Sequence, residues 1–396
     1  MEKIRIENLY KIFGSSAEKV IPLLEQGMSK AEIKEKTKCG VGVNNASFSV
    51  EEGEIVVVMG LSGSGKSTLV RCINKLIEPT AGKVFIDGQN MMDLSKEELR
   101  NLRQTKLGMV FQNFALFPHR TVTENTAYGL EIQGVDLESR TKKAHDALAL
   151  VGLAGWEDSY PDQLSGGMQQ RVGLARALAL DPDILLMDEA FSALDPLIRR
   201  DMQDELINLQ EKMQKTILFI SHDLDEALKL GDRIVLMKDG KIVQIGTPED
   251  ILTTPADNYV KRFVEDVDIT KVLTAESVMK RVEDVAYIKT DGPRAALRKM
   301  RKNNISNLFV IDEQRQLMGV ITAVDCARLV DEGSKNLRDI VCTGCKTTLL
   351  DTPAQDLFII MQDLTYPLAV VNESNHLKGV IIRGSLIAAM AERGVN

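Results

Sequence analysis

One stretch of the sequence spaces glycines, a lysine and hydroxyl side chains in a way that suits phosphate binding. Gly60-Leu-Ser-Gly-Ser-Gly-Lys-Ser-Thr68 fits the pattern G-x-x-x-x-G-K-[ST]. In such a loop, successive backbone N–H groups and the N-terminus of the following helix form a cradle for anions. Lys66 is expected to place its charge on the β- and γ-phosphates, and Ser67 to offer a hydroxyl oxygen to Mg²⁺. The candidate nucleotide contacts in the loop are Gly60, Ser62, Gly63, Ser64, Gly65, Lys66, Ser67 and Thr68.

Two other apolar runs end in side chains that could act on a bound nucleotide. Residues 184–187 lead into Asp188 and Glu189, and residues 216–220 lead into Ser221 and His222. Ligand sites in parallel sheets lie beyond the carboxyl ends of the strands, so these residues are expected near the loop. Asp188 would hold Mg²⁺ in its outer sphere, Glu189 would polarise an attacking water, and His222 would contact the γ-phosphate. The combination indicates a P-loop NTPase, because a glycine-rich turn alone explains neither Lys-Ser-Thr nor the preceding strand.

These residues require a parallel sheet to bring them together. Residues 1–265 alternate short β-rich runs with longer helical patterns, which predicts an α/β domain. The clearest predicted strands are 55–59, 184–187, 216–220 and 233–237. An acidic, turn-rich passage follows, and we interpret residues 266–276 as a linker.

Beyond the linker, residues 277–396 contain an internal repeat. Residues 308–321 align without a gap with 368–381, and the repeats span about 277–333 and 337–393. Each copy is predicted to form helix, strand, turn, strand and helix, with Gly319 and Gly379 suited to a tight hairpin and a close backbone approach. Two copies of one unit imply an α+β pair that shares a core.

Composition excludes several classes of protein. The 396 residues are 44% hydrophobic and 27% charged, with a net charge of −8, which argues against a nucleic-acid polymer as partner. The apolar runs are far shorter than the roughly 20 residues of a membrane span, and the first residues do not resemble a signal peptide. Five scattered cysteines favour a reducing compartment, with Cys342 and Cys345 as an incidental C-x-x-C. We therefore expect a soluble, intracellular chain.

Further motifs resemble those of ATP-binding-cassette (ABC) ATPases. Leu164-Ser-Gly-Gly-Met-Gln-Gln-Arg171 resembles the family's signature sequence. The resemblance implies that Ser165, Gly166 and Gly167 bind the γ-phosphate of an ATP held by a second copy of the chain. Gln112 matches the Q-loop glutamine, which senses Mg²⁺ and contacts membrane subunits. Three further matches are Asp195 in the D-loop, His222 as the switch histidine and Phe13 as the aromatic on which adenine stacks.

Several details narrow the resemblance to ATPase subunits of glycine betaine/proline-type quaternary-amine importers. They are Ala190 where most cassettes have proline, residues 114–120, the C-terminal repeats and an insertion at about 15–42. The insertion contains a capping-box start, Ser29-Lys-Ala-Glu32, and is predicted to form a short helix. The resemblance implies a homodimer with ATP and Mg²⁺, bound to membrane permease subunits that work with a substrate-binding receptor. It also implies a place on the cytoplasmic face of a bacterial or archaeal membrane.

The repeats resemble a tandem CBS (cystathionine-β-synthase-type) module. In such pairs a threonine and an aspartate three residues apart often hold a ribose, and Thr322 and Asp325 fit this pattern in the first copy. The second copy has neither residue. Cyclic di-AMP is one kind of CBS ligand in importers of this type, and another adenine nucleotide is equally compatible, because no residue of the sequence distinguishes them.

A cationic stretch suggests an ionic sensor. Four cations fall on one stripe of a predicted helix, with Leu297 and Met300 turned toward the core; they are Arg294, Arg298, Arg301 and Lys302. Anionic lipid would attract them at about 1 kcal/mol per cation, and salt would weaken that attraction. An ordinary solvated face remains the alternative.

Three other functions fit parts of the sequence. An ABC importer for a different solute, such as an amino acid, is the main alternative, although it would usually lack the insertion and the CBS pair. A chromosome-maintenance ATPase would have a long coiled coil between Lys66 and Ser165, and no sustained heptads occur there. A purely regulatory subunit is disfavoured by the intact catalytic set.

Overall fold

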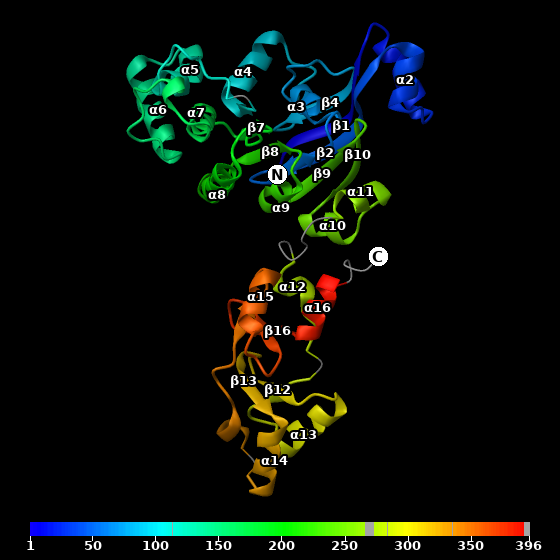
Figure 1. Cartoon of the computed structure of the whole chain (residues 1–396), viewed down its shortest axis with the longest axis vertical. Coiled ribbons are helices and arrows are strands. Elements are labelled where there is room, and N and C mark those ends of the chain that lie inside the picture. The colour runs from blue at the N-terminus through cyan, green and yellow to red at the C-terminus, as the bar shows by residue number, and fades with distance from the viewer. Residues whose placement is uncertain (113, 266–272, 283, 335, 392–396) are drawn as a thin grey trace. The chain divides into compact units, whose positions relative to one another are not determined.

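The chain folds into two compact units, residues 1–267 and 268–396. The computed structural model describes residues 1–391 except 113, 266–272, 283 and 335 (Figure 1). Most of the expected linker, residues 266–272, lies outside the described residues. From Leu273 the chain is part of the second unit, since Leu273 and Ala275 are buried in its core. Within the described residues, no helix combines the length and apolar character that a membrane crossing needs.

A six-stranded sheet forms the centre of the first unit. Its order is β10-β9-β3-β8-β7-β6, parallel except for β10 at one edge. The strands are β3 (Ile55–Met59), β6 (Leu107–Phe111), β7 (Ile184–Asp188), β8 (Thr216–Ser221), β9 (Arg233–Lys238) and β10 (Lys241–Gly246). All four strands expected from the sequence are present. They were visible as continuous apolar runs because strands covered on both faces bury nearly every side chain.

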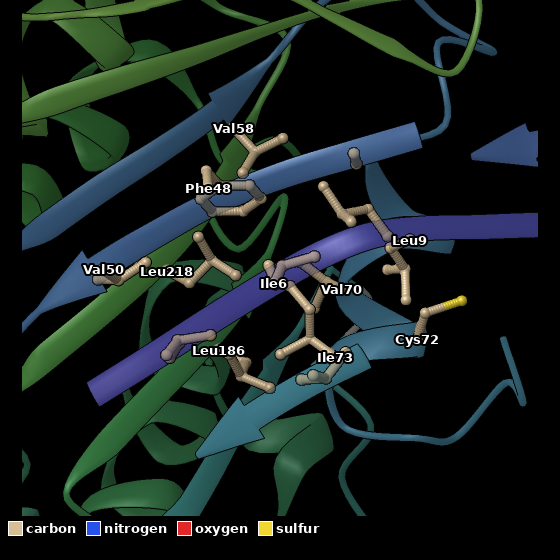
Figure 2. Packing of buried hydrophobic residues seen from close by; sticks show 14 of the residues in the cluster. Ile6, Leu9, Phe48, Val50, Val58, Val70, Cys72, Ile73, Leu186 and Leu218 are labelled. Atoms are coloured by element: carbon tan, nitrogen blue, oxygen red, sulfur yellow. The ribbon is translucent and has the colours of Figure 1, made fainter. Parts of the chain in front are cut away.

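A second, antiparallel sheet packs against the first across the main core. Its order is β2-β1-β4-β5, with β1 (Glu2–Phe13), β2 (Gly40–Glu51), β4 (Ala81–Ile86) and β5 (Gln89–Asn90). Figure 2 shows Ile6 and Phe48 from this sheet close to Leu186 and Leu218 of the parallel sheet, with Val70 of helix α3 (Lys66–Ile73) beside them. The core thus holds β3 and α3, the two elements that flank the phosphate loop.

Helices surround the sheets of the first unit. They are α4 (Lys96–Lys106), α5 (Val122–Ile132), α6 (Leu137–Leu150), η2 (Pro161–Gln163), α7 (Gly166–Leu178), α8 (Pro196–Met213), α9 (Leu224–Leu230), α10 (Pro248–Thr253) and α11 (Asn258–Phe263). Helices α5, α6 and α7 pack together as a helical group at one end of the unit (Figure 1). Helix α7 begins directly after Ser165, so the signature sequence lies at a helix N-terminus.

The insertion between β1 and β2 contains more structure than the single helix expected. It forms η1 (Ala17–Val20), α1 (Ile21–Glu25) and α2 (Lys30–Thr37). The predicted capping box is present: Ser29 Oγ accepts from Glu32 N at 3.3 Å, and Ser29 N donates to Glu32 Oε2 at 2.8 Å. Segments as short as η1 and α1 depend on tertiary packing rather than on helical periodicity, so the sequence pattern did not reveal them.

The second unit contains the expected repeat. Its sheets are β11-β12-β13 and β14-β15-β16. The strands are β11 (Ala286–Tyr287), β12 (Asn307–Ile311), β13 (Leu317–Thr322), β14 (Thr347–Leu349), β15 (Leu368–Val371) and β16 (Leu377–Ile381), and the helices are α12 (Ala275–Val278), α13 (Pro293–Lys302), α14 (Ala323–Asp331), η4 (Leu337–Ile340), α15 (Ala354–Met361) and α16 (Arg383–Ala391). Phe309, Leu317 and Val320 of the first copy pack against Ala369 and Val371 of the second, so the copies share a core.

Gly319 and Gly379 do not form the hairpin turns. They lie inside β13 and β16, and the chain turns between Asp312 and Gln316 and between Asn372 and His376. The close backbone approach is real: a Cβ on Gly319 would lie 2.4 Å from the carbonyl oxygen of Cys342. Packing between segments, rather than the turn, therefore requires glycine at this position.

Candidate nucleotide-binding site

The phosphate loop connects β3 to α3 and is shaped by close backbone contacts. Gly65 has φ +106°, and a Cβ there would lie 2.1 Å from the carbonyl oxygen of Gly42, so a larger residue does not fit. Lys66 is only 5% exposed, and its Nζ donates to the carbonyl oxygen of Gly60 at 2.8 Å. Burial lowers the pKa of Lys66, while the carboxylates of Glu189 and Asp188 act in the opposite direction. The ammonium is thus held inside the loop.

Ser67 and Asp188 meet at the carboxyl end of β7. The hydroxyl of Ser67 donates to Asp188 Oδ1 at 2.9 Å. Asp188 is buried, and its other oxygen lies 3.5 Å from a guanidinium nitrogen of Arg71, which no sequence motif had indicated. A hydroxyl and a carboxylate side by side are oxygen donors of the kind that Mg²⁺ prefers, so the pair fits the expected metal role.

Glu189 is the centre of a contact network. Its Oε2 lies 3.3 Å from Gln112 Nε2 and 3.2 Å from His222 Nδ1, and its Oε1 lies 4.0 Å from Lys66 Nζ. The backbone at Glu189 has φ +49° and its N–H donates to Ile220 O, which holds the residue at the end of β8. Ser192, which sequence reasoning did not single out, accepts a second hydrogen bond from Gln112 at 3.0 Å. The sheet therefore unites Lys66, Gln112, Glu189 and His222 as expected.

A pocket of about 440 Å³ joins these residues to Phe13. Its lining is Phe13, Lys30, Lys34, Gly40, Val41, Gly42, Ser62, Gly63, Gly65, Lys66, Ser67, Thr68 and Glu189. Phe13 is 45% exposed and offers a ring face at the end of β1. Gly60 and Ser64 are not part of the lining; Ser64 is buried beneath the loop, where its carbonyl oxygen accepts from Gly240 N. An aromatic face and a backbone cradle in one pocket suit a nucleotide.

The signature residues lie away from this pocket. Ser165 and Gly166 are exposed at the start of α7, and Ser165 Oγ accepts from Met168 N at 3.4 Å. Gly167 differs from its neighbours because it is buried: a Cβ would lie 2.4 Å from Ile198 Cγ2. Asp195 is exposed as the N-cap residue of α8. The helix start is thus open to a ligand, although packing accounts for the second glycine.

Comparison with known proteins assigns this arrangement to a family. The family model for ABC transporters matches residues 43–192, and the model for CBS domains matches residues 269–332. The glycine betaine/carnitine transport ATP-binding protein of Listeria monocytogenes is 57% identical over 396 residues, 100% of this chain and 99% of that protein. The glycine betaine/proline betaine transport system ATP-binding protein of Escherichia coli is 48% identical over 396 residues, again 100% of this chain and 99% of that protein.

The chain belongs to the glycine betaine-type ABC transporter ATP-binding proteins. A solved dimeric bacterial ABC transporter cassette is 34% identical, with a TM-score of 0.53 over 62% of this chain and 98% of that one. The family is one of ATPases, so the first unit is an ABC ATPase that binds ATP, with Mg²⁺ as its general cofactor. The second unit contains the CBS domain, and its internal repeat makes it a CBS module of two copies.

The two residues expected to bind a ribose in the CBS module form hydrogen bonds with each other. Thr322 Oγ1 donates to Asp325 Oδ2 at 2.7 Å and accepts from Asp325 N at 3.1 Å, which makes Thr322 the N-cap of α14. Asp325 also pairs with Arg328 at 3.2 Å. A cleft of about 580 Å³ lies elsewhere in the module, lined by both repeats, and neither Thr322 nor Asp325 is among its lining residues.

The cationic stripe of the CBS module exists as expected. Arg294, Arg298, Arg301 and Lys302 are exposed on α13. On the opposite face Met300 is buried and Leu297 is partly buried against the core of the first repeat. Lys299 is not part of the stripe, because its Nζ pairs with Asp291 at 2.8 Å and with Asp284 at 3.6 Å. The stripe thus presents four charges to the surroundings of the module.

Proposed function

We propose that this ABC ATPase is the ATP-hydrolysing subunit of an importer for glycine betaine or a related quaternary-amine osmoprotectant. The observation that carries the proposal is the extent of similarity: both quoted relatives match the whole chain, including the insertion and the CBS module. Both relatives carry glycine betaine in their names. The Lys66–Glu189–His222 contacts support an active ATPase rather than a purely regulatory subunit.

Two copies of the chain would form the working ATPase. Each ATP would lie between the loop of one copy and Ser165 and Gly166 of the other, which are exposed at a helix start, a position suited to binding anions. In this assembly Gln112 would respond to the nucleotide and contact permease subunits, with the ATPase at the cytoplasmic face of the membrane and a receptor delivering the substrate.

Each residue of the network then has a chemical role. Lys66 would hold the β- and γ-phosphates, and Ser67 with Asp188 would hold Mg²⁺, which neutralises charge on the phosphates when bound. Glu189 would orient the attacking water and take up its proton through Oε1 or Oε2. His222, at 3.2 Å from Oε2, would keep the carboxylate directed at that water.

We further propose that the CBS module regulates transport. The cleft between the repeats would take an adenine nucleotide, with cyclic di-AMP as one candidate, through Arg281, Tyr366 and Arg383. The stripe on α13 would bind anionic lipid at low ionic strength and release it as salt screens the charges.

Uptake of labelled glycine betaine tests these proposals in one system. Lipid vesicles would contain this ATPase with its permease, with ATP and graded salt inside, in neutral and anionic lipid. We expect ATP-dependent uptake in both kinds of lipid. In anionic lipid alone, uptake should begin only above a threshold salt concentration. The Arg298→Gln/Arg301→Gln/Lys302→Gln variant should lose the threshold, whereas Lys289→Gln/Arg338→Gln, which removes two exposed cations outside α13, should retain it.

The outcomes separate the claims. ATP hydrolysis with uptake of a different solute, such as an amino acid, would reject the substrate assignment while leaving the ATPase intact. An unchanged threshold in the triple variant would reject the role of the stripe.

A further inference from the structure

The insertion places two lysines beside the nucleotide pocket. Helix α2 is held in position by the buried side chain of Ile33, which packs with Tyr10, Ile12 and Val41 of β1 and β2. The capping box at Ser29 and Glu32 closes the start of the helix. Because side chains four residues apart share a face of a helix, Lys30 and Lys34 project together. Both line the pocket that contains Phe13 and Lys66.

The two lysines are not neutralised by neighbouring acids. Lys30 Nζ donates to the carbonyl oxygen of Gly63 at 3.0 Å, a neutral acceptor in the phosphate loop itself. Among the described residues, neither Lys30 nor Lys34 forms an ion pair. The only acidic residue in the lining of this pocket is Glu189, which already contacts Lys66 and His222. Two unpaired ammonium groups therefore face a pocket that also contains the buried ammonium of Lys66.

This arrangement suits a polyanion better than a base or a sugar. The aromatic end of the pocket is occupied by Phe13, whereas Lys30 reaches the loop whose N–H groups form the anion cradle. Lysine acts on phosphates as a mobile point charge, so Lys30 would exchange the Gly63 carbonyl oxygen for a phosphate oxygen when the nucleotide binds. Helix α2 thus adds two positive charges to the pocket that already contains Lys66.

We propose that Lys30 and Lys34 bind the phosphate groups of the nucleotide, so that the insertion is part of the ATP site. The inference rests on the proposed function of the loop. It requires that affinity depends on the number of phosphates: loss of either lysine weakens ATP most, ADP less and AMP least. Because Lys30 is partly exposed and Lys34 is exposed, salt should reduce their contribution.

Equilibrium titration of the full-length protein with fluorescent ATP, ADP and AMP analogues tests this proposal. We expect Lys30→Met or Lys34→Met to weaken ATP binding about three- to tenfold, the range for a charge-assisted hydrogen bond at a partly exposed site. Lys30→Arg should retain most of the affinity. Lys36→Met is the matched control, since Lys36 is exposed on the same helix and is not among the lining residues of the pocket. Thermal unfolding of each variant verifies that the fold is intact.

Two results would overturn the proposal. Unchanged ATP affinity in the Lys30→Met/Lys34→Met variant would show that the lysines do not contact the ligand. Equal losses for ATP and AMP would show an effect on pocket shape instead of phosphate charge. Lys66→Ala separates this failure from that of the proposed function: if it too leaves ATP affinity unchanged, the loop is not the nucleotide site at all.

Discussion

The nucleotide pocket of the ATPase and the cleft of the CBS module are similar in size but differ in how they are built. The first, about 440 Å³, is lined mainly by residues of the phosphate loop and of the strand ends beside it, among them Gly42, Gly65 and Lys66. The second, about 580 Å³, is lined by side chains from both repeats, among them Arg281 and Tyr366, that belong to no motif.

The difference shows which kind of site a sequence reveals. A cradle of N–H groups needs glycines at particular positions, as the 2.1 Å approach at Gly65 illustrates, so its chemistry is visible as a motif. A cleft shaped by side chains accepts many residue types. Thr322 and Asp325 match a ribose-binding pattern, and in the structure Thr322 also caps a helix by accepting from Asp325 N.

The largest effect is expected for the rate of ATP hydrolysis when Glu189, the centre of the contact network in the ATPase, is replaced. Glu189→Gln keeps the hydrogen-bonding shape but removes the group that can accept a proton from water. We expect ATP hydrolysis to fall on the order of 10²–10⁴-fold, the range for loss of a general base, while ATP binding is retained. Phosphate release and nucleotide titration on the same preparation measure both quantities.

Glu211→Gln serves as the control, because Glu211 is exposed on α8 and lies outside the pocket. A Glu189→Gln protein that hydrolyses ATP at the normal rate would remove Glu189 from the mechanism. In that case the contacts to Gln112 and His222 would be purely structural.

The sequence therefore predicted the parallel sheet and the residues at its carboxyl edge, and the reason is physical. Strands 55–59, 184–188 and 216–221 are buried on both faces, so their apolar runs are unbroken, and the chemistry follows directly at their ends. Lys30 and Lys34 could not be found in this way. Their spacing fits an ordinary solvated helix face, and only the tertiary position of α2 brings them to the pocket.

Local sequence patterns are equally ambiguous in the CBS module. A threonine three residues before an aspartate fits an N-cap and a ribose contact equally well, because both uses need a hydroxyl beside the first turn of a helix. Gly319 was recognised as a place of close approach, but its partner, the carbonyl of Cys342, comes from a segment that local sequence does not indicate.

A smaller effect tests the role of Thr322 as a helix cap. Thr322→Ala removes the acceptor for Asp325 N, so it should destabilise the CBS module by about 1 kcal/mol, the typical cost of losing an N-cap. Thr322→Ser should retain most of the stability, and ATP hydrolysis should not change. Urea unfolding of the full chain, monitored by hydrogen exchange at α14, measures the loss of stability. Weaker binding of an adenine nucleotide at unchanged stability would instead support the ribose role.

The smallest effect concerns a buried acid that no motif indicates in the ATPase. Glu226 contacts the end of β8, next to His222. It accepts hydrogen bonds from Ser221 Oγ at 2.5 Å and from Gln203 Nε2 at 3.1 Å. Burial raises the pKa of Glu226, so the neutral acid is favoured more in the folded than in the unfolded protein. Its contribution to stability is therefore complete below the ordinary glutamate pKa and is lost as pH rises through the raised value.

Glu226→Gln places a permanently neutral group at this position, so the variant does not lose stability as the pH rises. We expect the variant to gain up to about 0.5 kcal/mol in unfolding free energy at about pH 8, and no gain below about pH 4, where both side chains are neutral. Urea unfolding at the two pH values measures the difference, with Glu211→Gln as the exposed control. A gain that is equal at both pH values would arise from packing alone.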